Sequence, residues 1–188
     1  MTPVPKFSNA VISLRPFTPD DTPALHSYLN HPDLAGRRYI HWDFSQDLPL
    51  PPKQVSSLID KWNEAEEGVT FAVTRQADGA LLGHCSSSWG WDPHMPDCSV
   101  VVAPGHQRQG VATQALSLLL DYLFDFTIAH NVSLGIMEWN QPALDFAKKI
   151  GFTRVGLLRR ESFYGGKFCD EVILDLLRPE WKERRHAA

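Results

Sequence analysis

One segment in the middle of the chain constrains the fold more than any other. It is a short apolar strand that runs through a glycine-containing loop into a long amphipathic helix. The expected strand covers residues 98–102, the loop carries Gln107-x-x-Gly110-x-Ala112, and the helix covers residues 111–126. The first backbone N–H groups of a helix have no intrahelical acceptor, and the helix dipole adds positive charge there. Because residues 110 and 112 are small, a ligand can approach this backbone closely, and a phosphate or pyrophosphate suits it.

Two better-known phosphate loops are excluded by the residues themselves. No Gly-Lys-Ser/Thr follows Gly110, so this is not a Walker A loop, and one of the three glycines of the dinucleotide fingerprint is missing. Arg108 could add a positive charge toward a phosphate. The plain structural alternative, a turn glycine before an ordinary amphipathic helix, stays open on this motif alone.

The remaining segments alternate between strand-like and helix-like patterns. Thr18-Pro19-Asp20-Asp21 is a typical helix start, and Ala77-Asp78-Gly79 is a hairpin signal. We expect helices over residues 18–30, 52–67 and 141–149, and strands over residues 11–15, 69–73, 80–85, 98–102, 132–138, 153–159 and 172–177. This order predicts an α/β (α+β) fold with helices on both faces of a sheet, in a single domain over residues 1–188. The basic run in residues 178–188 is expected to be a solvated end.

Composition and charge exclude several classes of function. Hydrophobic residues make up 43% and charged residues 21% of the chain, as is ordinary for a globular protein. A net charge of −4 offers no positive field to nucleic acid, and the apolar run over residues 115–126 is too short to span a membrane. Three separated cysteines without a CxxC pair argue against disulfides and a structural metal site. Because residues 1–10 lack a signal-peptide pattern, we expect a cytoplasmic protein.

A second segment lies at a fitting distance from the loop: Asn140-Gln141-Pro142-Ala143 opens a short helix and Gly151-Phe152 follows it. Together the two segments resemble the GNAT superfamily of acetyl-CoA-dependent N-acetyltransferases. The loop matches its Gln/Arg-x-x-Gly-x-Gly/Ala motif, and the second segment matches its Asn, small residue and Gly-Phe. Gly166-x-x-x-Asp170 resembles the RimJ/RimL-type branch, the ribosomal-protein N-terminal acetyltransferases and their relatives. The similarity covers residues 11–177.

This resemblance implies a mixed, mostly antiparallel sheet whose two central strands, residues 97–102 and 132–138, splay apart. Acetyl-CoA would be the co-substrate, with no metal, and its pantetheine arm would lie in the opening. The residues expected to bind it are Val100, Val101 and Val102 for the arm, Gln107, Arg108, Gln109, Gly110, Val111, Ala112 and Thr113 for the pyrophosphate, and Asn140 beside the arm.

The catalytic groups are less well defined. Many members of the family have a tyrosine seven residues after the motif asparagine, where this chain has Ala147, so the general acid is unassigned; Ser99, Cys98 and Tyr164 are possible donors. Asp97 is the first candidate for the base and Glu138 the second. Either carboxylate could instead serve only to bind a neighbouring strand or loop.

Five histidine and tryptophan positions carry weaker signals. His94 could act as the base but is more simply a surface residue, and His84 is best explained as a structural histidine in a strand. Trp42, Trp89 and Trp91 could wall a substrate site or cap the core.

The resulting hypothesis is an N-acetyltransferase that moves the acetyl group to a primary amine by direct attack in a ternary complex. The acceptor is a protein N-terminus or a small cationic amine, and five acids near the expected site suit either cation: Asp43, Asp47, Asp92, Asp97 and Glu138. The alternative is a sensor or scaffold that binds acyl-CoA without turnover, which the missing tyrosine keeps open. A homodimer is an open possibility.

Overall fold

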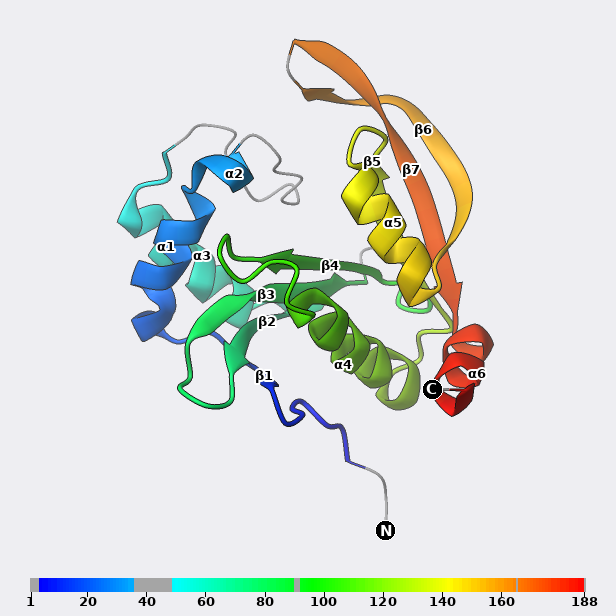
Figure 1. The fold of residues 1–188 in the computed structure, drawn as a ribbon, viewed down its shortest axis with the longest axis horizontal. Coiled ribbons are helices and arrows are strands. Elements are labelled where there is room, and N and C mark those ends of the chain that lie inside the picture. Colours follow the sequence, from blue (N-terminus) through cyan, green and yellow to red (C-terminus); the bar gives the residue numbers. More distant parts are fainter. Residues whose placement is uncertain (1–3, 36–48, 90–91, 165, 188) are drawn as a thin grey trace.

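The chain forms one mixed sheet, seen in a computed structural model that describes all residues except 1–3, 36–48, 90–91, 165 and 188 (Figure 1). Within these residues the strand order is β1-β2-β3-β4-β5-β7-β6. The strands are β1 (Ile12–Arg15), β2 (Gly68–Arg75), β3 (Leu81–Ser88), β4 (Asp97–Val102), β5 (Asn131–Met137), β6 (Thr153–Tyr164) and β7 (Lys167–Leu177). Neighbouring strands are antiparallel except β4 and β5, so the predicted mostly antiparallel sheet is confirmed.

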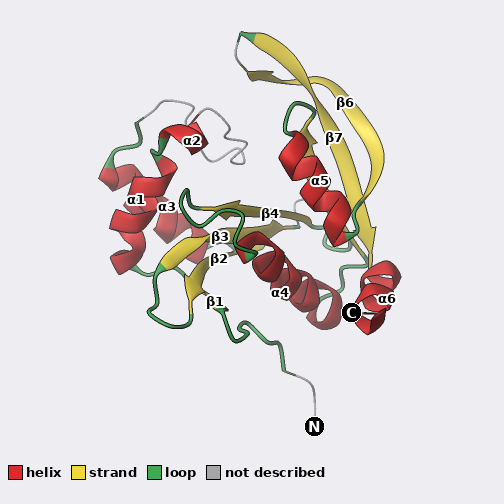
Figure 2. Ribbon diagram, in the orientation of Figure 1, coloured by secondary structure: helices red, strands yellow, loops and turns green. Residues whose placement is uncertain are grey.

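Helices cover both faces of this sheet (Figure 2). They are the short 3-10 helix η1 (Pro19–Asp21) and the α-helices α1 (Thr22–Leu29), α2 (Pro32–Ala35), α3 (Pro52–Asn63), α4 (Val111–Phe126), α5 (Gln141–Ile150) and α6 (Arg178–Ala187). Along β4, Val100 and Val102 pack against the core under α4, whereas Val101 packs against the core under α1 and α3. Successive side chains of a strand point to opposite faces, so this defines an α4 face and an α1–α3 face for the whole sheet.

The parallel strands β4 and β5 are paired only where the first residue of β4 lies opposite the third residue of β5. Asp97 pairs with Ser133, and the Ser133 N–H donates to the carbonyl of Pro96 at 3.0 Å. From there β4 continues alongside β3, and β5 continues alongside β7. The predicted splay of the two central strands is therefore confirmed. We call the end at Asp97 and Ser133 the closed end, and the end at Val102 and Met137 the open end.

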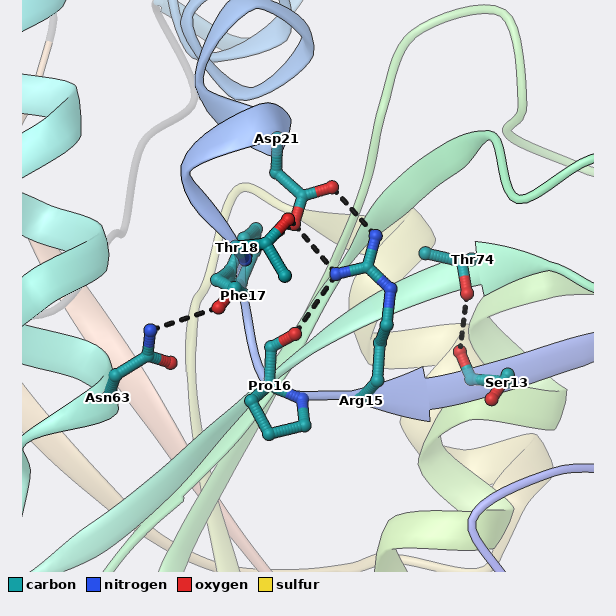
Figure 3. Close-up of polar contacts among 8 residues, drawn as sticks. All are labelled: Ser13, Arg15, Pro16, Phe17, Thr18, Asp21, Asn63 and Thr74. Carbon is teal, nitrogen blue, oxygen red and sulfur yellow. Dashed lines mark hydrogen bonds and ion pairs between the residues drawn. The ribbon is translucent and has the colours of Figure 1, made fainter.

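The first helix is tied to β1 by a buried carboxylate (Figure 3). Asp21 accepts two hydrogen bonds from the Arg15 guanidinium, at 2.7 and 2.8 Å, and one from the backbone N–H of Thr18 at 2.8 Å. Burial alone would raise the pKa of Asp21, but these bonds outweigh it and lower the pKa below its ordinary value. The expected helix over residues 18–30 thus begins one turn later as α1, after η1.

Cross-strand pairing lengthens several strands beyond their predicted ends. β3 continues to Ser88, and β6 and β7 form a long hairpin that rises away from the helices (Figure 1). Near its tip the rings of Phe163 and Phe168 are 5.2 Å apart. A bulge interrupts β6 between Leu158 and Ser162. The local pattern missed these extensions because the polar and charged residues there do not alternate as in a half-buried strand.

Most basic side chains of the C-terminal run are exposed to solvent, as expected, but the run is not a free end. It forms α6, which packs on α4 through Trp181, whose indole donates to Asp121 at 2.9 Å. Arg185 pairs with Asp121 at 2.7 Å and with Asp125 at 2.6 Å. These acids lie on the last two turns of α4, so charge complementarity fixes where α6 docks.

Candidate active site

The loop between β4 and α4 has the shape of an anion-binding site. Gly105, Arg108 and Gly110 all have positive φ angles of 88°, 59° and 79°. Where residues in the left-handed backbone region stand next to residues with negative φ, successive backbone N–H groups turn toward a common point. Gly110 is the N-cap residue of α4, and the N–H groups of the first turn of α4 have no intrahelical acceptor. This geometry suits an anion, and the binding of the pyrophosphate by this backbone stays a prediction.

The two glutamines of the motif hold this loop in shape. The Gln107 side chain donates to the carbonyl of Val102 at 3.1 Å, and the Gln109 side chain donates to the carbonyl of Gly105 at 2.9 Å. Their side-chain amides are therefore used within the loop, and what they offer a ligand is their backbone N–H groups. Arg108 and Thr113 are exposed at the same place.

The edge of β4 that faces β5 continues the site from the loop toward the closed end. Val100, Val101 and Val102 all pair with β3 on one side. Within the described sheet, the pairing of β4 with β5 stops after Asp97, so the other edge of these three residues has no strand beside it. An extended amide-containing chain can bind there by the same hydrogen bonds that a strand would make.

Asn140 stands across the opening, at the N-cap of α5. Its backbone N–H donates to the carbonyl of Met137 at 2.9 Å, which ties it to the open end of β5. Its side chain makes no capping hydrogen bond to α5. The side-chain amide is therefore not used by its own helix, as its predicted role beside the pantetheine arm requires.

The two candidate bases lie at opposite ends and on opposite faces. Asp97 is exposed at the closed end on the α1–α3 face, where its carboxylate accepts a short hydrogen bond from the Ser133 hydroxyl. Glu138 follows β5 at the open end, where its carboxylate accepts from the Asp170 N–H at 3.3 Å. By strand alternation Glu138 belongs to the α4 face, with Ile136.

The candidate acids differ in their surroundings. Ser99 lies on the α1–α3 face next along from Asp97, and its hydroxyl is 2.8 Å from that of Ser86 on β3. Cys98 points the other way into the core under α4, where burial raises the pKa of its thiol well above the ordinary value. Ala147 is completely buried in the same core. A tyrosine side chain would not fit at this position without displacing its neighbours.

The two histidines, His84 and His94, lie in different surroundings. His84 is buried on the α1–α3 face, and its Nδ1 is 2.7 Å from the hydroxyl of Tyr28, so it is structural as expected. His94 is exposed and its Nδ1 is 3.0 Å from the carboxylate of Asp92.

Trp89 is half-buried and packs against the core under α4. The predictions on Trp42, Asp43, Asp47 and Trp91 fall outside the described residues, as does the side chain of Tyr164.

Two acidic residues of β7 gain roles that the sequence did not reveal. Asp170, the last residue of the branch motif, accepts a hydrogen bond from the N–H of Arg160 at 2.8 Å. Arg160 is the bulge residue of β6 with a φ of 55°, so Asp170 stabilises the bulge. Glu171 is buried on β7, one residue before the strand expected over residues 172–177. If the expected strand had been extended toward Lys167, the alternation of its side chains would have placed Glu171 on the opposite face from the core-facing Val172.

Comparisons with known proteins agree with this geometry. A family model described as "Acetyltransferase (GNAT) domain" matches residues 12–153. The chain is 26% identical over 171 residues to the spermidine N(1)-acetyltransferase of Escherichia coli K12, covering 90% of this chain and 88% of that protein. It is 26% identical over 129 residues to the uncharacterized N-acetyltransferase YnaD of Bacillus subtilis, covering 69% of this chain and 75% of that protein.

Solved structures agree on the fold. Spermidine N-acetyltransferase from Vibrio cholerae, in complex with CoA and spermine, superposes with a TM-score of 0.79 at 20% identity, covering 93% of this chain and 99% of that one. A GNAT-family acetyltransferase from Bacillus anthracis superposes with a TM-score of 0.80 at 21% identity, covering 93% and 99%.

The chain belongs to the GNAT acetyltransferase family. It is an N-acetyltransferase that uses acetyl-CoA as co-substrate. The predicted superfamily is confirmed, whereas these relatives do not single out the RimJ/RimL-type branch. No helix in the described part of the chain is both long and apolar enough to cross a membrane. Nor do the described residues contain a group of three His, Cys, Asp or Glu side chains that could hold a metal ion.

Proposed function

We propose that this enzyme acetylates a small polycationic amine of the spermidine type rather than a protein N-terminus. The observation that carries the proposal is the similarity to spermidine N(1)-acetyltransferase, which extends over 90% of the chain. A net charge of −4 and carboxylates on both faces of the diverging strands favour a cationic acceptor.

In the proposed binding mode the pyrophosphate sits on the N–H groups of residues 107–113. The arm then extends along β4, past Val102, Val101 and Val100, toward the closed end. Asn140 contacts the arm from the opposite side of the opening. This brings the thioester near the closed end, where Ser99 and Asp97 lie on the α1–α3 face, so a backbone N–H of β4 near Val100 can stabilise the oxyanion.

The chemical step is a direct transfer in a ternary complex. The neutral amine nitrogen forms a bond to the carbonyl carbon to give a tetrahedral oxyanion, and the carbon–sulfur bond then breaks as the carbonyl re-forms and the thiolate leaves. The amine proton passes to Asp97, directly or through the Ser133 hydroxyl that it already contacts. We rank Asp97 above Glu138 because Glu138 lies at the open end and on the other face. The CoA thiol is acidic enough to leave as a thiolate near neutral pH, so a dedicated acid is dispensable.

The test is thiol release from acetyl-CoA with an acceptor panel: spermidine, short peptides with free N-termini, and no acceptor. Spermidine should accelerate release strongly over the blank, with the acetylated product seen by mass spectrometry. Preferential acetylation of the peptides would contradict the proposed acceptor. Tight acetyl-CoA binding without acceleration by any amine would favour the sensor alternative.

A further inference from the structure

Ser99 of β4 and Ser86 of β3 form a pair of hydroxyl groups beside the proposed reaction centre. The two residues are register partners in the antiparallel pairing of their strands, and their Oγ atoms are 2.8 Å apart. Both side chains are half-buried. Ser99 follows Asp97 in the alternation of β4, so the hydroxyl pair lies on the α1–α3 face next to the proposed base.

The backbone of β4 presents a hydrogen-bond donor to the opening at the same level. The N–H and C=O groups of successive residues in a strand point alternately to its two edges. The N–H of Ala103 donates to the carbonyl of Leu82 on β3 at 2.8 Å. On the other edge, the carbonyl of Pro96 accepts from the N–H of Ser133 on β5 at 3.0 Å. Even-numbered residues of β4 therefore face β5, and the N–H of Val100 points into the opening.

The hydrogen bond between the two serines decides where the Ser99 proton can point. A hydroxyl group carries one proton and can donate and accept at the same time. When Ser86 donates to Ser99, the proton of Ser99 is directed away from β3, toward the side of β4 that borders the opening. The first hydrogen bond then polarises the Ser99 hydroxyl and strengthens the bond that it donates. The Ser99 hydroxyl and the Val100 N–H thus offer two donors from adjacent residues.

We propose that the Ser99 hydroxyl is a second donor to the tetrahedral oxyanion, beside the N–H of Val100, and that Ser86 is the positioning residue that orients it. The inference rests on the proposed function and deepens it. Negative charge develops on the acetyl oxygen when the amine attacks, and preorganised donors at that position stabilise the transition state more than the bound thioester. Ser99 keeps its proton throughout, so the amine proton still passes to Asp97.

The kinetic test measures kcat and KM for spermidine at saturating acetyl-CoA in Ser99→Ala, Ser86→Ala and the double variant. Ser99→Ala should lower kcat by roughly a hundredfold, as the loss of one oxyanion donor does, and leave KM nearly unchanged. Ser86→Ala should lower kcat by up to roughly tenfold, the effect of one hydrogen bond. The double variant should be no slower than Ser99→Ala, because Ser86 acts only through Ser99.

Two further variants separate this role from a structural one. Ser86→Thr keeps a hydroxyl group and should recover most of the wild-type kcat. Ser87→Ala is the matched control, since Ser87 is the next residue of β3 on the opposite face, and its hydroxyl has no hydrogen-bond partner in the described part of the chain. Its kcat should be unchanged. The unfolding midpoint and the affinity for CoA should stay close to wild type in every variant, because a cross-strand hydroxyl pair adds little to the stability of a sheet.

Infrared spectra of bound acetyl-CoA, isotopically labelled at the acetyl carbonyl, give a readout without turnover. A hydrogen bond to the carbonyl oxygen lowers its stretching frequency. Ser99→Ala should therefore shift the carbonyl band upward, and Ser86→Ala should shift it in the same direction by a smaller amount.

A folded Ser99→Ala enzyme with unaltered kcat and an unaltered carbonyl band would overturn the inference and leave the proposed function intact. Losses that add up fully in the double variant would show that Ser86 does not act through Ser99. If the carbonyl band depends on Ser99 but the wild type acetylates peptides in preference to spermidine, the proposed function fails while this inference stands.

Discussion

At the scale of single residues, His84 links the two sides of the α1–α3 core. Its Nδ1 meets the Tyr28 hydroxyl at 2.7 Å, and the ring of Trp62 lies 5.1 Å away. Burial lowers the pKa of His84 to about 4 and raises the pKa of Tyr28 well above its ordinary value. The histidine is therefore neutral in the folded protein above about pH 4, and α1 is held on β3 by a neutral pair.

This pair predicts a loss of stability in mild acid. The pKa of His84 is about 4 when folded, against about 6.5 when unfolded, so the unfolded chain binds the extra proton between these values. Stability falls as pH drops from 6.5 to 4, by roughly 3 kcal/mol in total from this group. Urea unfolding at a series of pH values measures it. His84→Gln should be less stable at pH 8 but show a shallower decline; an equally steep decline would contradict the assignment.

Asp97 and Glu138 give a prediction about catalysis. Asp97→Asn should lower turnover at neutral pH by roughly a hundredfold and move the rate profile to higher pH, where the amine loses its proton unaided. Glu138→Gln is the matched control at the other end of the opening and should keep most of the activity. The pH dependence of kcat/KM with spermidine distinguishes them. Full activity in Asp97→Asn with loss in Glu138→Gln would reverse the ranking.

At the scale of elements, the β4–α4 loop gives the sharpest prediction. Gly110→Glu puts a negative side chain at a left-handed N-cap residue, where the pyrophosphate is expected, and acetyl-CoA binding should fall below detection by calorimetry. Gly79→Glu is the control, since Gly79 has a similar φ of 73° in a turn and a Cβ there would meet no atom within 4 Å. It should cost similar backbone strain and leave binding unchanged. Unchanged binding in a folded Gly110→Glu would remove the basis of the site.

Elements with a strong local sequence pattern could be predicted from the sequence. Features that depend on how one strand pairs with another could not. The strand–loop–helix segment, Asn140 and the splay followed from the motifs and the family resemblance. The bulge at Arg160 depends on Asp170 of the next strand, and the burial of Glu171 depends on the absence of a side chain at Gly135 on the neighbouring strand β5. Such contacts join residues ten or more positions apart, and no local periodicity reveals them.

At the scale of the whole molecule, α6 joins the C-terminus to the core under α4. Trp181 and Arg185 both bind Asp121, and Arg178 donates to the carbonyl of Thr127 at 2.9 Å just beyond α4. Asp121→Ala removes two of these contacts. Because Asp121 and Arg185 are each more than a third exposed, solvent screening limits the effect to about 1 kcal/mol, a fall in Tm of about 2–4 °C.

Thermal unfolding measures this effect, with Asp60→Ala on the exposed side of α3 as the control for losing an aspartate. Acetyl-CoA affinity should be unchanged in Asp121→Ala, because α6 lies away from the opening between β4 and β5. An unaltered Tm would mean that the two contacts of α6 with Asp121 add nothing to the stability of the fold.

We propose that the splayed strands and the β4–α4 loop together transfer an acetyl group to a polycationic amine. The most direct measurement supplies isotopically labelled acetyl-CoA to the enzyme with equal amounts of spermidine and a peptide with a free N-terminus, and follows both masses over time. We expect the label to appear first and mainly on spermidine, and on neither acceptor with Gly110→Glu. Label on the peptide alone, or equal labelling by Gly110→Glu, would contradict it.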